Sequence, residues 1–292
     1  MALRQDIGRF GLWSAELRSD DPALGGEIGE AAAELEELGY GALWVGGSSS
    51  VEHAARLVRA TSRITVANGI LSIWQHDAPT VARQFAELDQ ERPGRFVLGL
   101  GASHAKLAEA YHRPYSAMRD YLDALDAAPT PVPAERRVLA ALGPRMLALS
   151  GERAAGAHPY LVTAEYTAQA RQELGPEPLL APDLKVVLES DRDRALGIAR
   201  GFLARYLALP NYTANLERLG FTEDDFRDGG SDRLVDAVFA WGDADAIRKR
   251  VDEFHAAGAD HVALQVVDGG GHTALPRAGW RRLAEILDLA SA

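Results

Sequence analysis

Short apolar runs alternate with amphipathic helical patterns along almost the whole chain. Most of the runs precede a stretch whose apolar residues recur at helical spacing, as in residues 26–40. Repeated βα units favour a parallel sheet, and eight of them favour an α/β fold of the (β/α)₈ TIM-barrel type over an open doubly wound sheet. The runs predict strands at residues 9–13, 42–45, 64–70, 95–101, 137–142, 156–161, 183–190 and 261–267.

The length of the chain suits one such barrel. It has 292 residues, and a TIM barrel takes roughly 250. Residues 210–242 do not fit the βα pattern, and we expect them to form a helical insertion before the last strand. No linker or low-complexity stretch divides the sequence. We therefore expect a single domain over residues 1–292.

Composition excludes several classes of function. The formal net charge of -11 argues against non-specific nucleic-acid binding, which usually needs a basic face. The chain has no cysteine, so thiolate catalysis and thiolate metal sites are excluded. No apolar stretch suits a signal peptide or a membrane span, and we expect a cytoplasmic protein without a membrane partner. The His-Glu-x-x-His, Gly-x-Ser-x-Gly and Walker motifs are missing too, so we expect no metal site and none of those hydrolase mechanisms.

The segment RFVLGLGASH, residues 95–104, raises the question of a dinucleotide site. Its glycines, Gly99 and Gly101, end an apolar run, but His104 stands where the Rossmann fingerprint needs a third glycine. In a barrel, function gathers at the C-terminal ends of the strands, where bare glycines let a flat ring approach. Gly69 lies in a similar position, although a bulge that only shapes the barrel is an equally good interpretation.

Other residues at the expected barrel mouth are glycine, tryptophan and histidine. Gly143 directly precedes a predicted helix, where free amides suit a phosphate, although such a junction is more often only a helix start. A mouth with this lining suits the binding of an aromatic cofactor better than it suits a hydrolase mechanism. The candidates for the walls of a substrate pocket are Trp13, Trp44, Trp74 and His76. Core packing explains the three tryptophans at least as well.

Longer stretches resemble one family, and they run nearly end to end. The conjunction of LGLGASH, LAALGPRML and GSDRLVDA in this order is specific, whereas any one of them alone is weak. On these residues the chain resembles the luciferase-like superfamily of flavin- and deazaflavin-dependent oxidoreductases, and within it the group described as F420-dependent oxidoreductases. The matching stretches include GRFGLW, ELGYGALW, ANGILSIW, GRFVLGLGASH, VLAALGPRMLALS, GAHPYL, KVVLES and GGSDRLVDAVFAWG.

The resemblance implies a TIM barrel whose C-terminal mouth holds the flat ring of the cofactor. It also implies a non-proline cis peptide at the end of the third strand, either Gly69–Ile70 or Asn68–Gly69. Phosphate contacts are implied near the fifth and sixth strands, at Gly143 and residues 156–158. The full set of cofactor-binding residues that the resemblance implies is Asn68, Gly69, Ile70, Gly99, Gly101, Ser103, Leu142, Gly143, Gly156, Ala157 and His158.

The implied activity is hydride transfer between C5 of coenzyme F420 and a small organic substrate. His104 is the catalytic candidate, because an imidazole titrates close to the operating pH. The alternative that His104 only hydrogen-bonds a cofactor tail or loop backbone is equally open.

One departure from the family opens two rival functions. Relatives commonly carry an acidic residue or a histidine just after the second strand, and this chain has Gly46-Gly47-Ser48 there. Either His104 or His76 handles protons instead, or the protein binds the cofactor without catalysis. An FMN-dependent monooxygenase of the same fold is the other rival. Dimers are common in the superfamily, so a homodimer is compatible with the resemblance, and residues 210–242 could then serve as an interface or a lid.

Overall fold

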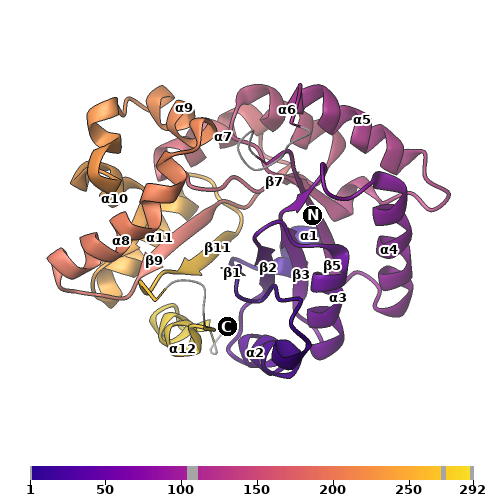
Figure 1. The fold of residues 1–292 in the computed structure, drawn as a ribbon, viewed down its shortest axis with the longest axis horizontal. Helices are drawn as coiled ribbons and strands as arrows, with labels where there is room; N and C mark the ends of the chain where they lie inside the picture. Colours follow the sequence, from indigo (N-terminus) through magenta and orange to yellow (C-terminus); the bar gives the residue numbers. More distant parts are fainter. Residues whose placement is uncertain (1, 104–110, 271–273, 290–292) are drawn as a thin grey trace.

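A computed structural model describes residues 2–103, 111–270 and 274–289. The chain forms a curled parallel sheet surrounded by helices (Figure 1). The first third contains α1 (Ala2–Ile7), β1 (Phe10–Ser14), η1 (Pro22–Leu24), α2 (Gly25–Glu37), β2 (Ala42–Gly46), α3 (Val51–Ala60), β3 (Thr65–Gly69), β4 (Leu71–Ser72), α4 (Ala78–Glu91) and β5 (Phe96–Gly101).

The rest of the described chain continues the alternation and adds an extra group of helices. Its elements are α5 (Pro114–Asp126), η2 (Ala134–Arg136), β6 (Arg137–Leu139), α6 (Pro144–Arg153), β7 (Gly156–Ala157), α7 (Ala164–Leu174), β8 (Leu179–Leu180), β9 (Asp183–Val187), α8 (Arg192–Leu207), α9 (Pro210–Arg218), η3 (Glu223–Gly229), α10 (Asp232–Val238), β10 (Phe239–Trp241), α11 (Ala244–Ala256), β11 (Val262–Val266) and α12 (Arg277–Ile286).

Backbone hydrogen bonds close the sheet into a barrel. The strand order is β10-β9-β11-β1-β2-β3-β5-β6-β7-β8, with β4 on β5. Only two residues separate β8 from β9, and this extended segment bonds to both of its neighbours. Ala181 donates to the Ala157 carbonyl on the β7 side, and Ala263 donates to the Pro182 carbonyl on the β11 side, each at 2.9 Å. With β3 and β4 taken as one strand and β8 and β9 as another, eight described strands surround the axis, which confirms the predicted TIM-barrel fold.

The region predicted as a helical insertion is only partly helical. Residues 210–218 and 232–238 are α-helices, but residues 239–241 form β10, which pairs with the C-terminal half of β9. Phe239 and Ala240 are buried there, so ladder hydrogen bonds and burial together favour the extended state. The insertion also has its own apolar cluster, which α8, α9 and α10 build around residues such as Leu203 and Leu216.

The helices begin where side chains satisfy the first free backbone amides. Asp77, Asp191 and Asp243 each accept a hydrogen bond from the amide three residues later, at 2.9 to 3.0 Å. Such N-caps each stabilise a helix by about 1 kcal/mol. These caps set where α4, α8 and α11 begin.

Inside the barrel, bulky side chains fill the axis. Trp44, Val97 and Val138 are at most 1% exposed and pack there, and α1 covers the bottom of the barrel with Leu3 and Ile7. The filled interior leaves the C-terminal mouth as the place where a ligand can enter. Within the part of the chain that the structure describes, no helix is both long and apolar enough to cross a membrane.

Candidate active site

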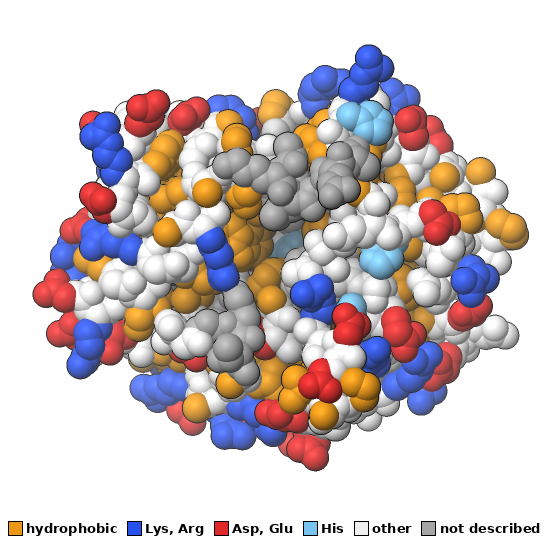
Figure 2. Space-filling model, in the orientation of Figure 1, with side chains coloured by type: hydrophobic (Ala, Val, Ile, Leu, Met, Phe, Trp, Pro, Cys, Tyr) orange, Lys and Arg blue, Asp and Glu red, His pale blue; other side chains and the backbone are white. Residues whose placement is uncertain are grey.

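A deep cleft lies at the C-terminal ends of the barrel strands. Its volume is about 1020 Å³. Figure 2 shows the hollow from outside, with hydrophobic side chains around it. The lining comes from the segment after β1, the ends of β2, β3 and β5, the β6–α6 junction, the segment after β7, and α8 and α9. This is the position at which TIM-barrel enzymes hold their substrates and cofactors.

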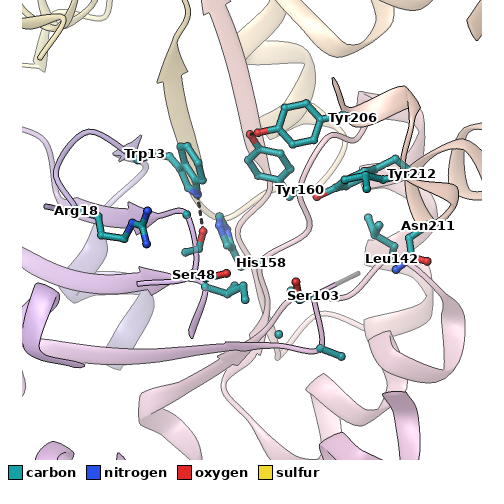
Figure 3. Close-up of a pocket in the computed structure, with 18 of the residues that line it drawn as sticks. Trp13, Arg18, Ser48, Ser103, Leu142, His158, Tyr160, Tyr206, Asn211 and Tyr212 are labelled. Carbon is teal, nitrogen blue, oxygen red and sulfur yellow. Dashed lines mark hydrogen bonds between the residues drawn. The ribbon is translucent and has the colours of Figure 1, made fainter. Parts of the chain in front are cut away.

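Trp13 forms one side of the cleft floor. Its Nε1 donates a hydrogen bond to the Gly69 carbonyl at 3.0 Å (Figure 3). A Cβ on Gly46 would lie 2.3 Å from the Trp13 ring, and a Cβ on Gly69 would lie 2.7 Å from Nε1. The indole therefore occupies the space in which a side chain at position 46 would stand. This explains physically why glycine follows the second strand in this chain.

The peptide bond Gly69–Ile70 is cis, which confirms one of the two bonds that the resemblance implied. Ile70 then turns toward the end of β5, where a Cβ on Gly101 would lie 2.7 Å from the Ile70 side chain. Gly69, Ile70 and Gly101 all line the cleft. Trp13, this cis bond and Gly101 together form a floor without charged side chains.

Two serines line the cleft in a left-handed conformation. Ser48 has φ of 57° and Ser103 has φ of 55°. Non-glycine residues rarely adopt this region, and such residues gather at ligand sites. Ser103 was predicted to bind the cofactor; Ser48 was noted only as part of a departure from the family. His104, the predicted catalytic residue, lies outside the described residues.

His158 borders the cleft as a neutral ring. Its Nδ1 donates to the Ala181 carbonyl at 2.7 Å, and the ring stacks on Trp44 at 4.1 Å. Burial lowers the pKa of His158 to about 3. Because Nδ1 carries the proton, Nε2 is an acceptor, and among the described residues this buried atom has no hydrogen-bond partner. A buried acceptor without a partner marks a place where a ligand group can donate.

Trp44 lies below the cleft and does not line it, contrary to the prediction. It is 1% exposed, and its Nε1 donates to His261 Nε2 at 2.9 Å. His261 Nδ1 donates to the Gly8 carbonyl, and burial lowers the pKa of His261 to about 4. Trp44 belongs to the interior because its position on β2 points along the barrel axis.

These buried histidines predict a loss of stability in acid. The unfolded chain protonates both near pH 6.5, whereas in the folded protein His158 and His261 stay neutral until about pH 3 and 4. Their contribution is fully present above pH 6.5 and is lost as pH falls. From pH 6.5 to 5 the free energy of unfolding should drop by about 3 kcal/mol for the two together. Urea unfolding at both pH values measures this, and His261→Asn should halve the drop; equal stability at both pH values would contradict it.

Other predicted site residues also lie away from the cleft. Trp74 lies outside it, where Nε1 donates to the Ala102 carbonyl and the ring packs on Tyr111 and His112. His76 is half-buried beyond it, and burial lowers the pKa of His76. Neither residue lines the cavity, so of the four predicted wall residues only Trp13 does. Both residues lie in the turn between β4 and α4.

Some of the predicted cofactor-binding residues line the cleft, and others do not. Asn68, Gly99, Gly156 and Ala157 do not line the cleft. Asn68 is fully buried and donates to Ser49 Oγ at 2.9 Å. Gly99 and Gly156 are bare because neighbouring strands approach closely: a Cβ on either would lie 1.9 Å from a carbonyl oxygen. Those that do line it are Gly69, Ile70, Gly101, Ser103, Leu142, Gly143 and His158.

Several lining residues were missed from the sequence. Glu16 and Arg18 follow β1 by two and four residues and line the cleft, and Ser14 Oγ donates to Glu16 Oε2 at 2.6 Å. Their position just after a strand end is a signal that could have identified them. Tyr206 and Tyr212 come from α8 and α9, and no local pattern in the sequence marks them.

A buried ion pair lies next to the cleft. Lys185 and Asp183 of β9 pair with each other, and both are at most 1% exposed. Asp183 also accepts from the Leu161 amide at 2.6 Å, and Lys185 Nζ lies 3.4 Å from the centre of the Tyr160 ring. Burial lowers the pKa of Lys185 to about 8 despite its partner. The described residues contain no cluster of three side chains suited to a metal ion.

The comparisons with known proteins agree with this geometry. A family model described as luciferase-like monooxygenase matches residues 9–261. The chain belongs to this family. No curated protein sequence matches the chain.

Solved structures of similar fold include enzymes with two different cofactors. The barrel resembles an F420-dependent secondary alcohol dehydrogenase solved with an F420–acetone adduct (TM-score 0.71, 14% identity, covering 97% of this chain and 98% of that one). It also resembles the coenzyme F420-dependent tetrahydromethanopterin reductase of Methanopyrus kandleri (0.73, 16%, 95% and 97%). A third is the oxygenating constituent of 3,6-diketocamphane monooxygenase of Pseudomonas putida with FMN (0.66, 16%, 96% and 96%). The luciferase-like fold therefore accommodates F420 in some members and FMN in others.

Proposed function

We propose that this luciferase-like protein is an F420-dependent oxidoreductase that transfers a hydride between C5 of the deazaflavin and a small organic substrate. The observation that carries the proposal is the uncharged cleft floor formed by Trp13, Gly69, Ile70 and Gly101. A flat, neutral surface at the strand ends suits a planar ring system. F420, when bound, supplies a carbon that donates or accepts a hydride, while the protein positions both reactants and excludes water.

The donor and acceptor groups around the floor fit such a ring. His158 Nε2 is a buried acceptor without a partner among the described residues, and an N–H or O–H group of a heteroaromatic cofactor is the kind of group that satisfies it. The pKa of His158, lowered to about 3, keeps the ring neutral at physiological pH. His158 would therefore bind and orient the cofactor and would not donate a proton.

The β6–α6 junction fits the phosphate of the cofactor. Gly143 is the N-cap of α6 and makes no side-chain cap hydrogen bond, and a Cβ there would meet nothing within 4 Å. Pro144 has no amide hydrogen and the Met146 amide donates to the Gly143 carbonyl at 3.1 Å, so the Arg145 amide and the dipole of this ten-residue helix are what favour an anion beside the cleft. Arg218, which donates to the Leu142 carbonyl, adds a positive charge beside them.

Proton transfer to or from the substrate needs a further group. His104 stays our proposal for this role, and Glu16, a carboxylate that lines the cleft and accepts a hydrogen bond from the Ser14 hydroxyl, is a second candidate. Position 46 cannot carry this function, because Trp13 occupies the space that its side chain would need.

Titration with F420 and with FMN tests the cofactor assignment. Trp13 borders the floor, so binding of F420 should quench the intrinsic tryptophan fluorescence with a micromolar dissociation constant. Trp13→Phe, which removes the nearby fluorophore, should reduce the quenching. Micromolar binding of FMN without binding of F420 would overturn the proposal in favour of a monooxygenase. If the protein binds F420 tightly but no acceptor in a panel of electrophiles consumes the hydride, the protein binds the cofactor without catalysing a reaction.

A further inference from the structure

One side of the cleft is built from four aromatic side chains, Trp13, Tyr160, Tyr206 and Tyr212, which we call the aromatic wall. The Tyr160 ring lies 5.2 Å from Trp13, 5.5 Å from Tyr206 and 6.1 Å from Tyr212, measured between centroids. Tyr206 and Tyr212 are 5.5 Å apart. All four line the same cavity, and Figure 3 shows the three tyrosines grouped beside Trp13. They come from β1, the segment after β7, α8 and α9, so only the folded barrel brings them together.

The aromatic wall is neutral. Burial raises the pKa of Tyr160 and of Tyr212 well above the ordinary value, so both remain phenols at physiological pH. The nearest cation, Lys185, is fully buried against the Tyr160 ring and is paired with Asp183, and it does not line the cleft. A ligand on this wall therefore meets ring faces and hydroxyl groups.

The hydroxyl groups gather at one edge of the wall. Tyr160 donates to Gln265 Oε1 at 2.8 Å, and the Tyr160 and Tyr206 hydroxyls are 2.9 Å apart. Gln265 is 2% exposed and orients the pair from β11. Because the single Tyr160 proton goes to Gln265, the Tyr206 hydroxyl donates to Tyr160, and the lone pairs left on Tyr206 Oη can accept a hydrogen bond from a ligand hydroxyl group.

The aromatic wall and the proposed cofactor floor lie in different parts of one cleft. The cleft has a volume of about 1020 Å³. The proposed cofactor ring uses the floor around Gly69 and Gly101, whereas three of the four wall residues come from the opposite half of the barrel and its insertion.

We propose that the aromatic wall binds the substrate, and that the substrate is a planar, ring-containing compound with one oxygen substituent. This inference rests on the proposed function, because it assigns the floor to the cofactor. Stacked or edge-to-face aromatic contacts and apolar burial favour such a compound over a short aliphatic alcohol or ketone.

Calorimetric titration of the cofactor-saturated protein tests this. The ring compounds 1-tetralol and 1-tetralone are compared with 2-propanol and acetone, which carry the same functional groups without a ring system. We expect the ring compounds to bind at least tenfold more tightly and to leave the cofactor bound, as measured by ultrafiltration. Equal affinities would overturn the proposal, and so would displacement of the cofactor, since the wall would then belong to the cofactor site. This comparison uses the unaltered protein and depends on no variant.

Variants then locate the binding. Tyr206→Leu and Tyr212→Leu should each weaken tetralone binding about three- to tenfold. Phe226→Leu is the matched control, because Phe226 packs on the same insertion without lining the cleft. If Phe226→Leu weakens tetralone binding equally, the aromatic wall is not the place where tetralone binds.

The cofactor and wall proposals can fail separately. If neither F420 nor FMN binds, the proposed function fails. Tenfold tighter tetralone binding that depends on Tyr206 and Tyr212 would still support the aromatic wall as a binding site.

Discussion

Replacing Lys185 by methionine should lower the free energy of unfolding by about 3–5 kcal/mol, measured by denaturant unfolding at pH 7. The substitution leaves Asp183 fully buried, with the Leu161 amide as a remaining donor and without its cation. Burial raises the pKa of Asp183, so without its cation the carboxyl must either keep an uncompensated charge or bind a proton, and both destabilise the folded state. Methionine matches the length of the lysine stem and therefore leaves packing largely unchanged.

A double variant separates the charge effect from packing. Asp183→Asn combined with Lys185→Met removes both charges and should recover most of the loss, because a buried pair contributes little compared with neutral residues of similar volume. Arg83→Met is the exposed control: the ion pair of Arg83 and Glu87 is solvent-exposed, and its loss should cost less than about 1 kcal/mol. If the free energy of unfolding of Lys185→Met lies within 1 kcal/mol of that of the unaltered protein, Lys185 and Asp183 are not both charged in the folded state.

Replacing His104 by alanine should reduce kcat roughly 10²- to 10⁴-fold and leave the dissociation constant of F420 unchanged. The physical reason is that hydride transfer to or from a carbon that bears oxygen also moves a proton, and an imidazole, which titrates close to the operating pH, can exchange it. The rate of oxidation of reduced F420 by an electrophilic acceptor measures the first quantity, and tryptophan fluorescence measures the second.

Two other variants decide whether the effect belongs to His104. His76→Ala is the matched histidine control, since His76 does not line the cleft, and its rate should stay unchanged. Glu16→Gln tests the carboxylate that the sequence reasoning missed. A full rate in His104→Ala together with a large loss in Glu16→Gln would transfer the proton role to Glu16.

Much of the barrel could be predicted because its signals are local. Apolar runs of strand length and amphipathic stretches of helix length depend on neighbouring residues only, and their repetition implies a parallel sheet with its mouth at the strand ends. The strand β10 was missed because three residues, Phe239–Trp241, carry too little pattern. They become a strand through pairing with β9, a contact between segments more than 50 residues apart.

The residues of the cleft floor could be predicted from the sequence better than the residues of the cleft walls. Gly69 and Gly101 end strands, Ser103 follows one of them by two residues, and strand ends meet at the mouth of any parallel barrel. Trp13 and Trp44 occupy paired positions on β1 and β2, yet one lines the cleft and the other lies inside the barrel. Their difference arises from what each ring meets: the Gly69 carbonyl for Trp13, and His158 and His261 for Trp44.

The sequence by itself determined the repeated βα order, the barrel class and the end of the barrel at which a ligand enters, because periodicity and strand polarity are properties of continuous segments. By resemblance it also limited the cis peptide to Gly69–Ile70 or Asn68–Gly69, and the structure decided for the first. Only the tertiary structure decided which side chains share the cleft. Tyr160, Tyr206 and Tyr212 lie up to 52 residues apart in the chain and meet because the insertion folds back over the mouth. Glycine at position 46 likewise has its reason in a side chain from another strand, since the indole of Trp13 fills the space beside it.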